Sequence, residues 1–148
     1  MFKPETTIRS FSSGEECLKS VENQPDIIIL DYFLNGNDPN AMNGLQVLKK
    51  IKNISSDTKV IMLSAQDKME IAVNLIKFGA YDYIIKNNNV FLRTKLVVSN
   101  AVNAISIAKE LKNSKLMIKL VTGIIVGIVI TVIALNLFYP ALFMMGEH

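Results

Sequence analysis

Three side chains of different chemistry each lie at the end of a short apolar run in this 148-residue sequence: the carboxylate of Asp31, the hydroxyl of Ser64 and the ammonium group of Lys86. A carboxylate can act as a nucleophile or bind Mg²⁺. A hydroxyl and an ammonium group can hold phosphoryl oxygens and offset their charge. If the three meet, they suit phosphoryl transfer onto Asp31. Each also has a purely structural reading, as a loop cap, a hydroxyl near a helix and a solvated strand end, respectively.

The surrounding pattern predicts elements that bring these residues together. The runs at 25–32, 59–64 and 81–86 lack apolar–polar alternation, which is typical of strands buried on both faces. A further strand is expected at 6–11, and helices at 13–21, 44–54, 67–79 and 90–111, with a capping box from Ser13 to Glu16 and Asp67 as an N-cap. Strands alternating with helices predict an α/β fold with a doubly wound parallel sheet, in which ligands bind at the carboxyl ends of the strands.

The C-terminal part has the composition of a membrane span. No charged side chain occurs from Leu120 to Gly146, and 120–138 is almost wholly aliphatic. About 20 helical residues cross a bilayer core. Tyr139 is placed to anchor at the far interface and Pro140 to end the helix. A buried core helix is the alternative, but a domain this small has no interior able to surround it.

Charge predicts the orientation of this span. Residues 1–89 carry 10 basic and 11 acidic side chains, whereas 90–119 carry six basic side chains and Glu110 alone. Four lysines directly precede the span: Lys109, Lys112, Lys115 and Lys119. The positive-inside rule places the N-terminal body in the cytoplasm, and the lysines suit anionic membrane lipid. Gly123 and Gly127 form a GxxxG pair that predicts a homodimer through close helix packing.

Composition also excludes several classes of function. Cys17 is the only cysteine, so no internal disulfide can form. His148 is the only histidine, which excludes a histidine-based triad or a His/Cys zinc site within one chain. Nucleic acid is not an expected partner, because the basic segment lacks interleaved aromatic residues and directly precedes the apolar span.

The segments PDIIILDYFL, MNGLQVLKKIK, TKVIMLSAQD and GAYDYIIKN together resemble the receiver domain of bacterial two-component response regulators. The resemblance covers about residues 6–110. It implies a flavodoxin-like fold and a regulatory, non-enzymatic domain in a phosphorelay. It further implies that Asp31 accepts phosphate from a sensor histidine kinase, that Ser64 and Tyr83 act as switch residues, and that Lys86 pairs with the phosphate. The Phe33 backbone carbonyl would join Asp31 in binding Mg²⁺.

The sequence departs from the family pattern at its beginning. Receivers start with a strand followed by two adjacent acidic residues that hold Mg²⁺, and no such strand or pair precedes Asp31. The run at 6–11 aligns with the family's second strand, so the first strand and helix are expected to be missing. Glu15 and Glu16 are adjacent but lie on the wrong element. The Mg²⁺ site is therefore expected to be weakened.

These observations predict four parts: a partial receiver-like domain at 1–112, a basic neck at 113–119, a transmembrane helix at 120–138 and a short outer tail at 139–148. The expected function is a receiver module anchored in the bacterial inner membrane by a single span. Two alternatives stay open. One is a pseudo-receiver that binds proteins without accepting phosphate, and the other is a truncated response regulator.

Overall fold

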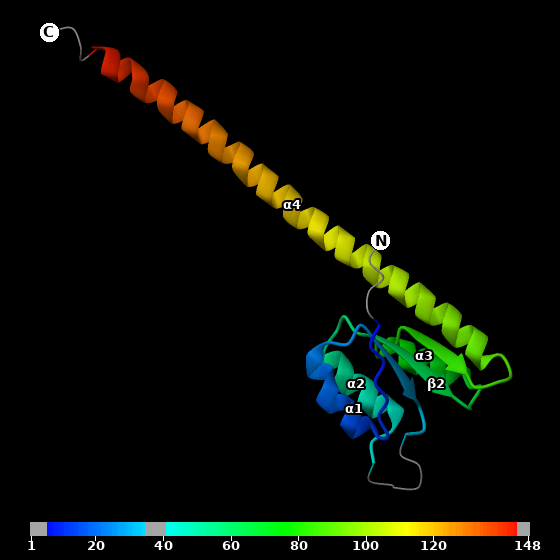
Figure 1. Cartoon of the computed structure of the whole chain (residues 1–148). Coiled ribbons are helices and arrows are strands. Elements are labelled where there is room, and N and C mark those ends of the chain that lie inside the picture. Colours follow the sequence, from blue (N-terminus) through cyan, green and yellow to red (C-terminus); the bar gives the residue numbers. More distant parts are fainter. Residues whose placement is uncertain (1–5, 35–40, 145–148) are drawn as a thin grey trace. The chain divides into compact units, whose positions relative to one another are not determined.

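The computed structural model describes residues 6–34 and 41–144 (Figure 1). The strands are β1 (Ile27–Asp31), β2 (Lys59–Ser64) and β3 (Asp82–Ile85). The helices are α1 (Gly14–Ser20), the 3₁₀ turn η1 (Val21–Asn23), α2 (Gly44–Ile54), α3 (Met69–Lys77) and α4 (Val90–Met144). Strands and helices alternate from β1 to α4, as the hydrophobic pattern predicts.

The three strands form one parallel sheet in the order β1-β2-β3. Ile27 of β1 is in register with Lys59 of β2, and Asp31 with Leu63. Across the other side of β2, Ser64 is in register with Ile85 of β3. All three strands run in the same direction, so their carboxyl ends lie at the same end of the sheet. This end carries Asp31, Ser64 and, one residue after β3, Lys86.

Two apolar clusters cover the two faces of this sheet. On one face, α1, α2 and α3 pack against β1 and β2; its fully buried members include Val21, Leu48, Ile51, Met62 and Leu75. Figure 1 shows α1 and α2 side by side on this face. On the other face, Ile61 and Ile84 pack with Val97 from the first turns of α4. Helices therefore lie on both faces, as in a doubly wound fold.

Local sequence accounts for the start of α2. The Asn43 side chain accepts a hydrogen bond from the Gln46 N–H, and the Gln46 side chain accepts one from the Asn43 N–H, both at 3.0 Å. This reciprocal capping box satisfies backbone donors that a helix start leaves unpaired. The next residue, Gly44, contacts the end of β1 so closely that a Cβ there would lie 2.4 Å from the Asp31 carbonyl oxygen. A glycine is thus required where α2 meets the strand that carries Asp31.

The prediction of a strand at 6–11 is wrong. These residues lie outside every helix and strand and are exposed, with Ile8 88% exposed. A strand forms only where a neighbouring strand satisfies its backbone groups. Among residues 6–34 and 41–144, no strand pairs with this segment.

Two helix ends also differ from the prediction. The helix after β2 begins at Met69, and its N-cap is Lys68 without a side-chain hydrogen bond, so Asp67 is not the cap. At the other end of the chain, α4 continues to Met144 and passes Pro140, which was expected to end the helix. Proline removes one backbone donor, and a long apolar helix can continue past that loss.

The chain divides into two compact units, residues 1–104 and 105–148. In the second unit the described apolar side chains beyond Ile105 are exposed; Ile124, for example, is 63% exposed. Three polar side chains of this unit bond to carbonyls of their own helix: Thr122 to Ile118, Thr131 to Gly127 and Asn136 to Val132. Among the described residues there is one helix long and apolar enough to cross a membrane.

Candidate functional site

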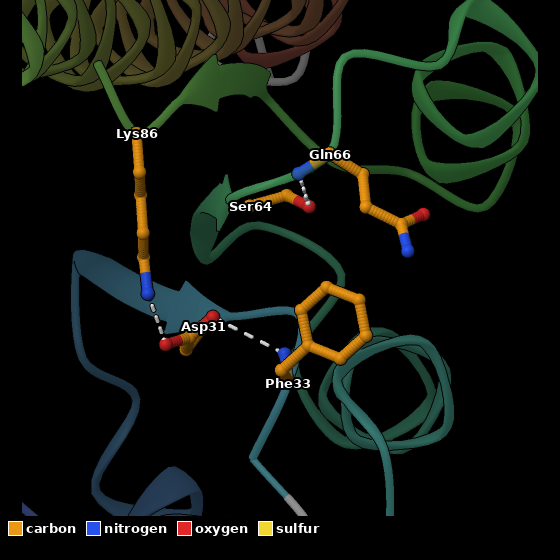
Figure 2. A network of polar contacts seen from close by, with 5 residues as sticks. All are labelled: Asp31, Phe33, Ser64, Gln66 and Lys86. Atoms are coloured by element: carbon orange, nitrogen blue, oxygen red, sulfur yellow. Dashed lines mark hydrogen bonds and ion pairs between the residues drawn. The ribbon is translucent and has the colours of Figure 1, made fainter.

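The carboxylate of Asp31 lies at the carboxyl end of β1 and contacts two groups from different elements (Figure 2). The Lys86 ammonium, one residue beyond β3, forms an ion pair with Oδ2. The Phe33 N–H donates to Oδ1 at 3.1 Å. The side chains of Lys86 and Asp31 are 38% and 32% exposed, so water and a ligand can reach the pair.

The hydroxyl of Ser64 lies on the neighbouring strand, buried at the end of β2. Its oxygen accepts a hydrogen bond from the Gln66 N–H at 3.1 Å. The Lys86 N–H donates to the Ser64 carbonyl at 2.7 Å, which ties the start of the lysine side chain to the strand that carries the hydroxyl. Figure 2 shows Ser64, Asp31 and Lys86 together at the carboxyl ends of the strands.

Gln66 is the member of this network that the sequence analysis did not identify. Its N–H binds the Ser64 hydroxyl, and its carbonyl accepts a hydrogen bond from the Tyr83 hydroxyl. One residue therefore links the alcohol of β2 to the aromatic ring of β3. The sequence contains no signal for this role beyond position, because the contacts use the Gln66 backbone, which any residue except proline could supply in full.

The loop after β1 is attached to the body at two points. The Gly44 N–H donates to the Tyr32 carbonyl at 2.9 Å. The Glu15 carboxylate of α1 accepts a hydrogen bond from the Met42 N–H at 3.0 Å. This hydrogen bond is the largest of the effects that lower the pKa of the Glu15 carboxyl below the ordinary glutamate value of 4.5. Part of this loop, residues 35–40, lies outside the described residues.

The donor set does not fit a tight Mg²⁺ site. In residues 6–34 and 41–144 there is no group of three or more His, Cys, Asp or Glu side chains able to hold a metal ion. Asp31 supplies one carboxylate, and that carboxylate is already paired with Lys86. Hard divalent cations prefer several oxygen ligands. Glu15 and Glu16 do not add to the set, because they bond to Met42 and to Ser12, respectively.

Cys17 has no chemical role at this site. The residue belongs to α1 and its side chain is buried in the apolar cluster. Burial raises the pKa of its thiol. A thiol with a raised pKa is a poor nucleophile at neutral pH. Cys17 therefore acts as a small apolar side chain.

The parallel sheet therefore carries a carboxylate, an alcohol and an ammonium group at the carboxyl ends of its three successive strands. The family model of the response regulator receiver domain matches residues 2–97. The chain belongs to this family, so the resemblance stated from the sequence is confirmed.

Relatives and solved structures agree with this assignment. The chain is 33% identical over 92 residues to the nitrogen assimilation regulatory protein NtrX of Azorhizobium caulinodans, covering 62% of this chain and 19% of the relative. It is 31% identical over 107 residues to the regulatory protein LuxO of Vibrio cholerae, covering 72% and 22%. The crystal structure of the receiver domain of NtrX from Brucella abortus matches with a TM-score of 0.58 and 29% identity, over 67% of this chain and 80% of that domain.

The chain thus spans about a fifth of the length of these two curated relatives. The matches establish a receiver domain with a flavodoxin-like parallel sheet, and with it a place in two-component signalling. Receiver domains are regulatory.

Proposed function

We propose that this chain is a membrane-anchored receiver module that accepts a phosphoryl group on Asp31 from a sensor histidine kinase. The observation that carries the proposal is the contact between Lys86 and Asp31 across three strands, beside the buried hydroxyl of Ser64. The ion pair holds a positive charge next to a nucleophilic oxygen. Charges fixed where phosphoryl oxygens will lie assist the transfer without further reorganisation.

The proposed reaction is a transfer between two side chains. An Asp31 carboxylate oxygen attacks the phosphorus of a phosphohistidine on the kinase, an O–P bond forms and the N–P bond breaks. The imidazole leaves with the bonding electron pair and takes up a proton from water. Lys86 then exchanges its contact with the carboxylate for one with the phosphoryl oxygens. The Ser64 hydroxyl, whose oxygen accepts from Gln66, can donate its own proton to a phosphoryl oxygen.

We further propose that Ser64, Gln66 and Tyr83 transmit the modification. If Ser64 turns toward a phosphoryl group, its oxygen leaves the Gln66 N–H. The carbonyl of the same residue accepts from Tyr83, so a shift of Gln66 changes the position of the aromatic ring. Tyr83 is partly buried against the apolar cluster, where a move of the ring requires repacking.

The proposal for the membrane rests on α4. Its 120–137 segment exposes aliphatic side chains and satisfies its three polar side chains within the helix. In lipid, polar groups must find partners inside the protein. With four lysines between 109 and 119, the span would place the receiver domain in the cytoplasm, at the bacterial inner membrane. The Gly123–Gly127 face is the proposed contact of a helix dimer in the membrane.

The phosphoacceptor role can be tested with a small acyl phosphate as donor and intact-mass spectrometry of the full chain. We expect a mass increase of one phosphoryl group that is stable in acid and lost in base, and no such increase in Asp31→Asn. Asp26→Asn is the matched control, because this carboxylate lies just before β1, at the opposite end of the strand. An equal adduct on Asp31→Asn, or none on the wild-type chain, rejects the role.

One observation favours a second candidate function, a pseudo-receiver that binds a protein partner without phosphorylation. The donor set of the described residues contains a single carboxylate for a divalent cation. In that case Asp31→Asn would leave partner binding and signalling in cells unchanged. A loss of signalling in this variant, with normal protein levels, supports the phosphoacceptor instead.

A further inference from the structure

The second compact unit begins with a stretch of α4 that precedes the apolar span, residues 105–119, here named the pre-span segment. Three of its aliphatic side chains, Ile107, Leu111 and Ile118, are 57%, 57% and 62% exposed. Their spacing of four and seven residues is that of a heptad repeat, in which positions a and d face a partner helix. Leu111 and Ile118 take position a, and Ile107 and Ser114 take position d. These four residues form an uncharged seam along the helix.

The charged residues of the pre-span segment are ordered around this seam. Glu110, its only acidic residue, takes position g, and Lys115 takes the next position e. In a parallel pair of helices, g of one chain lies beside the following e of the other, where opposite charges form interhelical ion pairs. Lys109, Lys112 and Lys119 take the outer positions b and f. The seam is therefore bordered by complementary charges, and like charges do not oppose each other across it.

A basic partner for Glu110 is not supplied by its own helix. Side chains three or four positions apart are neighbours on a helix surface. The residues at those positions around Glu110 are uncharged: Ser106, Ile107, Asn113 and Ser114. Lys115, five positions on, lies about 140° around the same helix. The cation that suits Glu110 therefore comes from a second helix.

The continuity of α4 argues against the membrane surface as the cover of the seam. An amphipathic helix bound to lipid lies in the plane of the interface. The pre-span segment instead continues unbroken into the apolar span, which crosses that plane. It therefore projects away from the bilayer, where Ile107 and Leu111 would otherwise face water.

We propose that two copies of this chain pair through the seam as a parallel two-stranded coiled coil, with Glu110 of each copy bound to Lys115 of the other. The parallel orientation rests on the membrane anchor proposed above, because two copies inserted in one membrane point the same way. A short helix pair alone is marginal in water. The span offsets this weakness, since it holds both copies in one plane and raises their effective concentration.

The seam is distinct from the glycine face of the span. Gly123 and Gly127 take positions f and c of the same repeat, on the side of the helix away from a and d. A copy that used both contacts would meet two different neighbours. The two interfaces can therefore be tested independently of each other.

A disulfide test locates the seam. Ser114→Cys places a thiol at position d, and the matched control Asn113→Cys places one at the neighbouring position c, which faces away from the partner. Both native residues are polar and exposed. Each variant is made in a Cys17→Ala background of the full chain and oxidised in membranes of the expressing cells. Oxygen with a copper catalyst accepts the electrons and protons that two thiols lose as they form one disulfide. We expect Ser114→Cys to give a covalent dimer at several times the yield of Asn113→Cys, and equal yields overturn the proposal.

Charge reversal tests whether the occupant is a second copy in this register. Added to Ser114→Cys, Glu110→Lys opposes two lysines across the seam and should lower the disulfide yield several-fold. Lys115→Glu should do the same by opposing two glutamates. The combined variant Glu110→Lys with Lys115→Glu restores opposite charges and should recover the yield. A combined variant that stays as low as the single variants contradicts the proposed pairing.

Two further measurements separate the seam from the other proposals. Gly127→Leu fills the glycine face and should leave the Ser114→Cys yield unchanged. A fall to the Asn113→Cys level would assign the dimer to the glycine face and overturn the seam. An alkaline carbonate wash of the same membranes reports on the anchor. Release of the chain contradicts the anchor and with it the parallel orientation, whereas a retained chain with equal yields at the two positions contradicts the seam alone.

Discussion

At the scale of single residues, the site depends on which groups the backbone holds next to the Asp31 carboxylate. Lys86 reaches it from the end of β3, and the Phe33 N–H binds its other oxygen. Asp31, Ser64 and Lys86 could be predicted from the sequence, because each ends an apolar run and parallel strands bring such ends together. Gln66 could not, because its two contacts use backbone atoms that leave no mark on residue type.

The lysine should matter for the rate of phosphorylation more than for stability. An ion pair this exposed contributes about 0–1 kcal/mol to folding. A charge fixed beside the transferring phosphoryl group has a much larger effect, on the order of 10²-fold in rate. We therefore expect Lys86→Ala to slow adduct formation from an acyl phosphate by about that factor, measured as a time course by mass spectrometry.

Lys95→Ala is the control for this comparison, because it removes an exposed lysine from α4 outside the site. It should leave the rate unchanged. If Lys86→Ala and Lys95→Ala react equally fast, Lys86 does not assist the transfer.

Glu15 should make stability depend on pH in a defined direction. Its bond from the Met42 N–H lowers its pKa below 4.5 in the folded chain. A lowered pKa contributes stability that is present above 4.5 and is lost as the pH falls through the folded-state pKa. We expect Glu15→Gln to be less stable than wild type above pH 4.5, with the difference shrinking below it. Urea unfolding at a series of pH values measures this, and a difference that grows on acidification contradicts it.

At the scale of elements, the close contact of α2 with the end of β1 positions the strand that carries Asp31. Buried parallel strands and capped helices follow from hydrophobic period and cap residues, so the central elements could be predicted nearly to the residue. The segment at 6–11 could not, because a strand depends on a partner elsewhere in the chain. The predicted start of α3 is also wrong. Asp67 is a good capping residue, but the helix begins after Lys68, which makes no side-chain cap.

Gly44 gives a direct test of that contact. A Cβ at this position would lie 2.4 Å from the Asp31 carbonyl oxygen and 2.7 Å from the Tyr32 Cα, and backbone atoms cannot move aside cheaply. Overpacking of this kind costs about 1–3 kcal/mol. Gly44→Ala should therefore lower the free energy of unfolding of the receiver domain by about that amount, as measured in urea.

The matched control for this substitution is Gly123→Ala. Its added Cβ would meet nothing within 4 Å, so the stability of the receiver domain should stay the same. Equal stability of Gly44→Ala and wild type would show that α2 is not held against β1 in this way.

At the scale of the whole molecule, a receiver domain is joined to a helix with the length and composition of a membrane span. The apolar run and the lysines before it could be read directly from the sequence. The end of the helix could not, since Pro140 lies within α4 and a proline does not always end a helix. The first strand and helix of the family pattern are absent from the described residues, and β1 accordingly forms an edge.

Membrane anchoring predicts where the chain is found after cell lysis. The wild-type chain should stay in the membrane pellet after an alkaline carbonate wash. Ile125→Lys together with Val129→Lys should move it to the soluble fraction, because each charge at the centre of a span costs about 2.5–3.5 kcal/mol on insertion scales. Leu111→Lys, in the lysine-rich segment before the span, is the control and should remain in the pellet. A wild-type chain released by carbonate contradicts the anchor.

The most direct test of the account is the mass of the chain after incubation with an acyl phosphate, followed by peptide mapping. We expect one phosphoryl group, base-labile and located on Asp31, with a slower gain in Lys86→Ala and none in Asp31→Asn. A chain that gains no phosphoryl group, or gains it at another residue, contradicts the claim that Asp31, at the carboxyl end of β1, accepts phosphate.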